Sequence, residues 1–179
     1  MNQPIEFYLS SLMNIEWESP EHFYFPSELA KQWLIEPSSL SLRLAKHCRN
    51  LSVKLQYNQI VEKKMLRADE CELFPDQVCL LREVVLQGDE QHWVVARTLI
   101  PSETLNDGQY DLSQQGEVPL GLTVFRADNV ERDQLQVGSI KTNHGVLLAR
   151  RSRLWMNNKP MLVAELFLPH APIYSMEKN

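Results

Sequence analysis

Apolar residues recur at helical spacing near the start of the chain. Leu29, Trp33 and Leu34 share one face of a predicted helix that should end before Pro37, because the residue preceding a proline is pushed out of the α region. Two serines then open a second predicted helix, over residues 38–48. The pattern therefore predicts a hairpin of two short helices.

Strict alternation of apolar and polar residues replaces this pattern further along the chain. It predicts a strand over residues 53–61, and further strands are predicted over 78–87 and 91–100, joined by a short glycine turn, and over 135–140, 146–156 and 161–168. Residues 69–76 and 106–118 are predicted as loops, and residues 119–125 as a short helix. Because no long helix separates successive strands, the sheet should be antiparallel and the domain should belong to the α+β class.

Two charges stand alone on apolar faces of these predicted strands. Arg82 shares its face with Val84, and Glu165 shares its face with Val163. If both faces turn the same way, a cation and a carboxylate project into an apolar cavity, which would suit a small ligand with a carboxylate at one end and a hydroxyl at the other. Two alternatives are structural: Arg82 and Glu165 pair only with each other, or Glu165 pairs across the hairpin with an arginine of segment 150–153.

Length and composition restrict the class of protein. The chain has 179 residues, enough for one domain with a sizeable core, and a formal net charge of −5, which does not favour nucleic acid as a partner. Three cysteines without CxxC spacing indicate a reducing compartment and no zinc site. With neither a signal peptide nor an apolar run long enough to span a membrane, we expect a cytoplasmic, soluble monomer without a bound metal.

Five short segments, in order and at matching spacing, resemble the chorismate pyruvate-lyase family. They are residues 80–83 (LLRE), 96–101 (ARTLIP), 119–121 (PLG), 150–154 (RRSRL) and 165–169 (ELFLP), and the ending 172–174 (PIY) also fits. The resemblance implies a lyase that converts chorismate to 4-hydroxybenzoate and pyruvate, the first committed step of ubiquinone biosynthesis, without any cofactor. It also implies one domain with a six-stranded antiparallel sheet and helical flaps over an internal ligand cavity.

The resemblance also places a domain boundary and individual site residues. The lyase-like domain should span residues 26–174, with an N-terminal extension over 1–25 and a tail over 175–179. Matched by motif, Arg82 would bind the ring carboxylate and Glu165 the ring hydroxyl, as the two catalytic residues. Leu120 would offer a backbone contact, and Leu40 takes a position that is often methionine in the family.

Four points remain open in the sequence. Four arginines are candidates for the second carboxylate of chorismate: Arg97, Arg132, Arg151 and Arg153. Glu165 could transfer a proton or only orient the hydroxyl. The same fold serves as the effector-sensing domain of winged-helix repressors, so a non-catalytic small-acid sensor is the alternative function, although no DNA-binding module fits before Trp33. The hairpin over residues 27–49 should be a flap, and the alternative is a fixed core hairpin.

Overall fold

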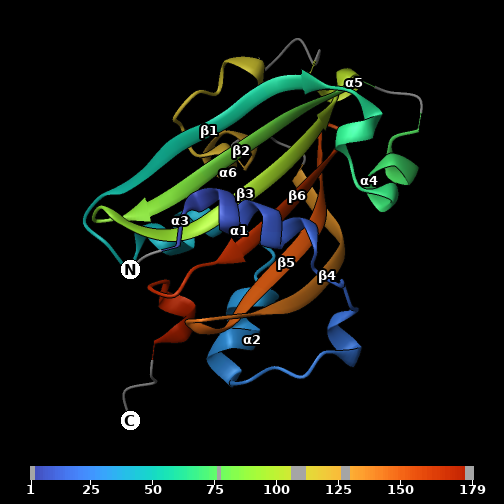
Figure 1. Ribbon diagram of the computed structural model, residues 1–179. Helices are drawn as coiled ribbons and strands as arrows, with labels where there is room; N and C mark the ends of the chain where they lie inside the picture. Colours follow the sequence, from blue (N-terminus) through green and yellow to red (C-terminus); the bar gives the residue numbers. More distant parts are fainter. Residues whose placement is uncertain (1–2, 76–77, 106–111, 126–129, 176–179) are drawn as a thin grey trace.

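A single antiparallel sheet of six strands organises the molecule (Figure 1). The computed structural model describes residues 3–75, 78–105, 112–125 and 130–175. The strands are β1 (Leu51–Val61), β2 (Cys79–Gly88), β3 (Gln91–Pro101), β4 (Val130–Thr142), β5 (Gly145–Met156) and β6 (Lys159–Phe167). Their order across the sheet is β1-β2-β3-β6-β5-β4. The predicted α+β class and the predicted six-stranded antiparallel sheet are therefore confirmed.

Tight two-residue turns set the register of two hairpins. Asp89 and Glu90 join β2 to β3 with φ values of 47° and 70°, and Asn157 and Asn158 join β5 to β6 with φ values of 52° and 64°. Positive φ at both central positions gives the turn a twist that matches paired strands. Asp89 also accepts hydrogen bonds from the backbone N–H groups of residues 49 and 50, which anchors the chain leaving the helical hairpin.

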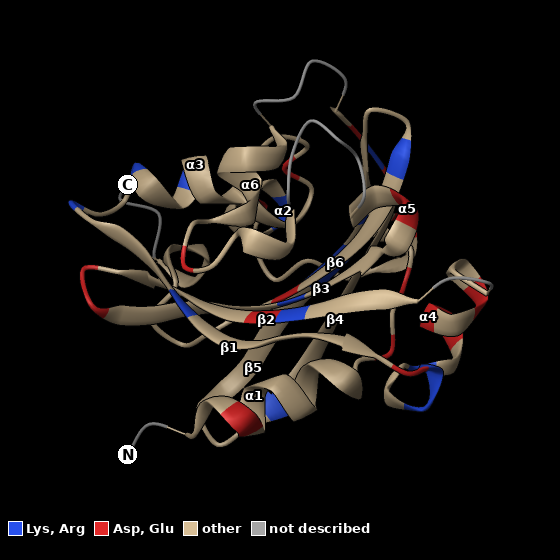
Figure 2. Ribbon diagram, turned by 90° about the horizontal axis from the view of Figure 1, so that it is seen from above, with Lys and Arg blue, Asp and Glu red and all other residues tan. Residues whose placement is uncertain are grey.

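Helices cover both faces of the sheet (Figure 2). They are α1 (Ile5–Met13), α2 (Glu28–Leu34), α3 (Leu40–Ala45), α4 (Ala68–Leu73), α5 (Ser102–Leu105) and α6 (Leu120–Val124), with 3-10 turns at Pro20–His22, Lys63–Met65, Leu112–Gln114 and Pro172–Tyr174. Helices α1 and α4 pack on one face, here called the outer face. Helices α2, α3 and α6 pack on the opposite face, here called the cavity face.

The outer face shows two departures from the sequence predictions. Tyr8 and Leu12 of α1 are buried against Val95 and Leu166 of the sheet, although no element is predicted over residues 1–25. Helix α4 replaces part of the loop predicted over residues 69–76, since the Glu70 side chain accepts a 2.7 Å hydrogen bond from the backbone N–H that precedes the helix. The domain boundary at residue 26 stays a prediction.

The cavity face carries two apolar clusters. Trp33 and Leu34 of α2 belong to the first, together with Leu44 of α3, and Val124 of α6 belongs to the second with Leu154. Both helices of the predicted hairpin are present and each begins with a serine cap, but α3 ends at Ala45 rather than at residue 48. Polar and charged side chains lie between the two clusters and form the site described next.

Candidate active site

A small internal cavity of about 50 Å³ lies between the sheet and helices α3 and α6. Its lining comes from α3, from α6 with the residue that follows it, and from five strands: Leu40, Ser41, Leu120, Gly121, Phe125, Arg82, Val84, Leu86, Ala96, Thr98, Arg132, Leu154, Val163 and Glu165. The structure thus brings together four residues that the sequence singles out, Leu40, Arg82, Leu120 and Glu165. Of the four candidate arginines for a second carboxylate, Arg132 alone belongs to this lining.

Arg82 is a buried cation without a carboxylate partner among the described residues. Its side chain is 1% exposed, and its two terminal nitrogens donate to the backbone oxygens of Gly116 (2.7 Å) and Val118 (3.0 Å). Burial lowers the pKa of Arg82, because a guanidinium loses hydration away from water. Carbonyl oxygens orient the group but do not neutralise it, so Arg82 retains a full positive charge for an anion.

Glu165 pairs with Arg150, a residue that the sequence analysis does not single out as a candidate. The Arg150 Nε donates to Glu165 Oε2 at 2.7 Å, and the two residues lie directly opposite each other on β5 and β6. Pairing of Glu165 across the hairpin is therefore present in the structure, whereas mutual pairing of Glu165 with Arg82 is not. Counting back from the Asn157 and Asn158 turn gives this register, so the sequence contains the signal.

Arg132 reaches the cavity from β4 and holds the turn between α2 and α3. It donates to the backbone oxygens of Pro37 (3.2 Å) and Ser38 (3.3 Å) and to the hydroxyl of Ser152. Burial and the neighbouring Arg150 charge lower the pKa of Arg132 to about 10. The group stays charged at neutral pH, and an anion beside it would relieve both the desolvation and the repulsion.

The other three candidate arginines lie on the outer face, and each pairs with a carboxylate. Arg97 pairs with Glu70 at 3.0 Å, Arg151 with Asp69 at 2.8 Å, and Arg153 with Asp133 at 2.7 Å. The Arg97 and Glu70 side chains are both nearly inaccessible to water. Because each of the three arginines already has a carboxylate partner in the protein, none of them requires a ligand.

The described charges in and beside the cavity do not cancel. Arg82, Arg132 and Arg150 contribute three positive charges and Glu165 one negative charge, which leaves an excess of two positive charges; Arg82, Arg150 and Glu165 are buried and Arg132 is half-buried. Uncompensated buried charge is costly, so such a site is best suited to a ligand with two negative charges.

The cover of the cavity is closely fitted. A methyl group added to Gly121 of α6 would lie 2.9 Å from the Ser39 hydroxyl and 3.2 Å from the Ser41 hydroxyl. Glycine at this position lets α6 approach α3 more closely than any larger residue would allow. The two helices therefore meet above the ligand space and exclude water from it.

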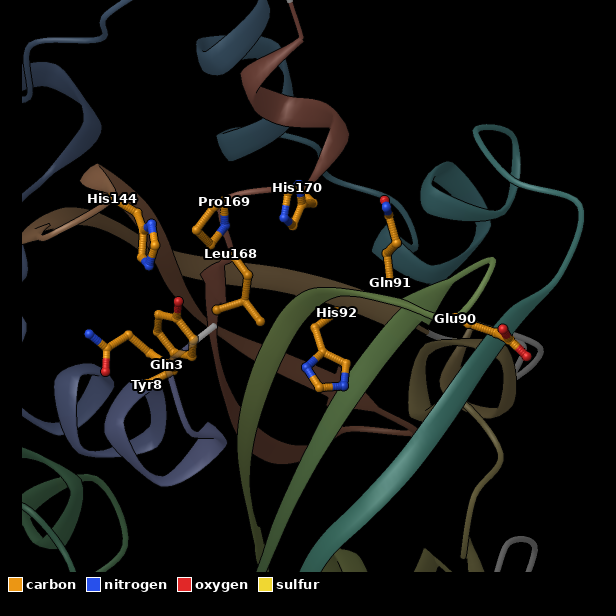
Figure 3. A pocket seen from close by; sticks show the side chains of 9 residues that line it. All are labelled: Gln3, Tyr8, Glu90, Gln91, His92, His144, Leu168, Pro169 and His170. Atoms are coloured by element: carbon orange, nitrogen blue, oxygen red, sulfur yellow. The ribbon is translucent and has the colours of Figure 1, made fainter. Parts of the chain in front are cut away.

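A second hollow, of about 250 Å³, lies away from this cavity (Figure 3). Its lining includes His92 at the start of β3, His144 in the turn between β4 and β5, His170 after β6, and Tyr8 of α1. Across the part of the chain that is described, no group of three or more His, Cys, Asp or Glu side chains is placed to hold a metal ion.

Comparison with solved structures defines the class of fold. The ligand-binding domain of a protein assigned to the GntR family of transcriptional regulators, from Bordetella bronchiseptica, superimposes with a TM-score of 0.52, and the match covers 73% of this chain and 91% of that one. The two sequences are 13% identical, so the likeness concerns the fold alone. Along the described residues, no helix has the length and apolar content needed to cross a membrane.

Sequence comparison then gives the family. The chorismate lyase family model matches residues 11–179. A protein named "probable chorismate pyruvate-lyase" from Vibrio parahaemolyticus is 62% identical over 99% of both chains, and the chorismate pyruvate-lyase of Serratia proteamaculans is 40% identical over 93% of this chain and 92% of its own. The chain belongs to the chorismate lyase family.

Proposed function

We propose that the protein is a lyase that converts chorismate to 4-hydroxybenzoate and pyruvate, the first committed step of ubiquinone biosynthesis. The observation that carries this proposal is the buried cavity with an excess of two positive charges. Chorismate is a dianion that also carries a hydroxyl group, and the cavity offers cations for both carboxylates and a carboxylate for the hydroxyl. The names of the relatives in the family point to the same reaction.

Arg82 and Glu165 bind opposite ends of the ring in this proposal. Arg82 lies opposite Thr98 on β3, and Glu165 lies opposite Ala96 on the other side of the same strand. Two strand spacings and an offset of two residues place their α-carbons on the order of 12 Å apart. Side chains that point toward each other across this distance can hold the ring carboxylate at one end and the ring hydroxyl at the other.

Arg132 binds the enolpyruvyl carboxylate. In chorismate the enolpyruvyl ether occupies the ring carbon next to the one that carries the hydroxyl, so the second carboxylate must lie near Glu165. Arg132 meets this condition because it interacts electrostatically both with Glu165 and with Arg150, the partner of Glu165. A guanidinium also suits a planar carboxylate, to which it donates two parallel hydrogen bonds.

The main task of the protein in this reaction is to bind chorismate in its reactive conformation. The ether bond breaks at the ring, the hydrogen on the hydroxyl-bearing carbon passes to the enolpyruvyl methylene, and the ring becomes aromatic as pyruvate forms its carbonyl. Glu165 accepts the hydrogen bond of the hydroxyl, because an ionised carboxylate has only acceptor sites. Orientation of this kind, with water excluded by Leu40 and by the backbone at Leu120, supplies the catalysis.

Substrate entry requires part of the cover to move. The free space of about 50 Å³ is lined by residues of α3 and α6, whereas no residue of α2 belongs to its lining. We therefore assign the flap to α3 and α6, and leave α2 as the fixed half of the hairpin. Hydrogen exchange tests this assignment: amides of α3 and α6 should gain protection when 4-hydroxybenzoate binds, and amides of β1 should not. Equal exchange with and without product would leave a fixed cover.

Pyruvate release from chorismate tests the function. The purified protein, assayed with lactate dehydrogenase and NADH, should release one pyruvate for each 4-hydroxybenzoate, and treatment with EDTA should not change the rate. Binding of chorismate without pyruvate release would favour the alternative of a non-catalytic sensor domain. Dependence on an added divalent metal would contradict the proposed mechanism.

A further inference from the structure

Arg150 makes contacts that an ion pair alone does not require. It is 0% exposed, its Nε donates to Glu165, and its Nη1 donates to the backbone oxygen of Glu36 at 2.9 Å. Its Nη2 is buried with no hydrogen-bond partner among the described residues. Buried donors are nearly always paired, so an arginine with a purely structural role would be expected to have hydrogen-bond acceptors for more of its guanidinium N–H groups.

The backbone oxygen that Arg150 holds belongs to the turn between α2 and α3, residues 36–38. The next two oxygens of this turn, those of Pro37 and Ser38, accept from Arg132. Two cations of the site therefore hold three successive carbonyls of the segment from which α3 starts. If α3 moves with the flap, this turn is where the movement begins.

We infer that Arg150 is a positioning residue that couples the orientation of Glu165 to the closed state of the α2–α3 turn. This inference rests on the proposed function. The guanidinium is planar and rigid, so its Nε and Nη1 keep a fixed relative direction. When the turn opens, the Glu36 oxygen moves away from Arg150. The Arg150 guanidinium can then rotate and no longer holds the Glu165 carboxylate in one orientation. Closure restores it, so the carboxylate is aligned only when the cavity is shut.

Substitution of Arg150 by lysine separates this coupling from a simple charge effect. Arg150→Lys keeps the charge and can pair with Glu165, but one ammonium does not hold the planar bridge to both groups. We expect 4-hydroxybenzoate to dissociate at least fivefold faster, as measured by stopped-flow displacement. The matched control is Arg153→Lys, three residues along the same strand and paired on the outer face, which should release product at the wild-type rate.

A change in the turn itself provides the reciprocal test. Pro37→Gly loosens the turn and replaces no side chain that we place against the substrate, although the Pro37 oxygen accepts from Arg132. It should lower the single-turnover rate of pyruvate formation at least threefold, because Glu165 is aimed only when the turn is closed. Pro20→Gly, in the 3-10 turn after α1, is the matched control and should leave this rate unchanged.

The double variant Arg150→Lys/Pro37→Gly tests whether Arg150 and the turn act together or independently. If Arg150 and the turn act as one device, the double variant should release product no faster than the faster single variant. Multiplied effects, or wild-type product release in Arg150→Lys, would overturn the inference. An unchanged single-turnover rate in Pro37→Gly would also overturn it, even if Arg150→Lys failed to fold. Absence of pyruvate from the wild type would instead refute the proposed function, since the release test needs only 4-hydroxybenzoate.

Discussion

Arginines on the two faces of the sheet have different partners. Six arginines lie on the described strands, three on each face. On the outer face Arg97, Arg151 and Arg153 each pair with a carboxylate. On the cavity face Arg150 pairs with Glu165, whereas the described partners of Arg82 and Arg132 are backbone carbonyls and one hydroxyl. Excess positive charge, rather than the presence of arginine, marks the candidate site.

The pKa shifts contrast the more exposed Arg153 with Arg132, although burial also lowers the pKa of Arg151 on the outer face. The hydrogen bond with Asp133 raises the pKa of Arg153 and, in return, lowers the pKa of the aspartate. Burial lowers the pKa of Arg132 to about 10, with repulsion from Arg150 adding to the effect. In an outer-face pair of this kind the two charges of the protein neutralise each other. On the cavity face the excess positive charge is unfavourable in the free protein, and a bound dianion would offset this cost.

The largest effect on stability should come from an outer-face pair. Arg97→Met removes the cation from a buried pair and leaves Glu70 as an unpaired buried charge. The free energy of unfolding, measured by urea titration, should fall by about 3–5 kcal/mol. Unchanged stability would mean that the outer-face pairs do not differ from the cavity arginines.

Arg82→Ala should act mainly on binding. No described carboxylate loses its partner when Arg82 is removed, but the ring carboxylate of the ligand does. Affinity for 4-hydroxybenzoate, measured by calorimetry, should weaken by about 2–4 kcal/mol, or roughly 30- to 700-fold. Wild-type affinity in this variant would show that Arg82 only holds the loop at residues 116–118.

Glu165→Gln should lower turnover by a smaller factor. The amide oxygen can still accept a hydrogen bond, but the charge that strengthens the contact with the hydroxyl and balances the buried Arg150 is lost. A loss of about 1.5–3 kcal/mol corresponds to a kcat roughly 10- to 150-fold lower. The matched control is Glu83→Gln, on β2, whose carboxylate lies 3.9 Å from Arg97 on the outer face, and its kcat should stay near that of the wild type.

The smallest effect should come from the most exposed of the three outer-face arginine pairs. Arg153 and Asp133 are both partly open to solvent, so water screens their attraction. Arg153→Met should therefore change the free energy of unfolding by less than about 1 kcal/mol, as measured by urea titration, and should not change turnover. A larger loss of either would place Arg153 among the functional arginines.

Alternation and turn residues in the sequence predicted the sheet well. Strand β2 was predicted over 78–87 and spans Cys79–Gly88, and the faces of Arg82 and Glu165 followed from the two-residue period. Strand β4 was predicted too short. An irregularity between Asp133 and Gln136, with Gln134 at a φ of 48°, interrupts its alternation and returns Arg132 to the cavity face.

Other parts of the site depend on contacts that local patterns do not contain. Helix α1 is short and begins without a side-chain cap, and it is fixed by packing on strands far along the chain. Burial of Arg97 by Glu70 depends on α4, which was predicted as loop. Only the assembled sheet separates Arg132 from the three arginines that face outward.

The central claim is that the unpaired arginines of the cavity face act on chorismate and that the paired arginines of the outer face do not. Pyruvate release from chorismate, measured side by side in the wild type, Arg82→Ala and Arg153→Met, tests it most directly. The account predicts equal kcat/KM for the wild type and Arg153→Met and a decrease of at least tenfold for Arg82→Ala. Equal kcat/KM in the two variants, or no pyruvate from the wild type, would contradict it.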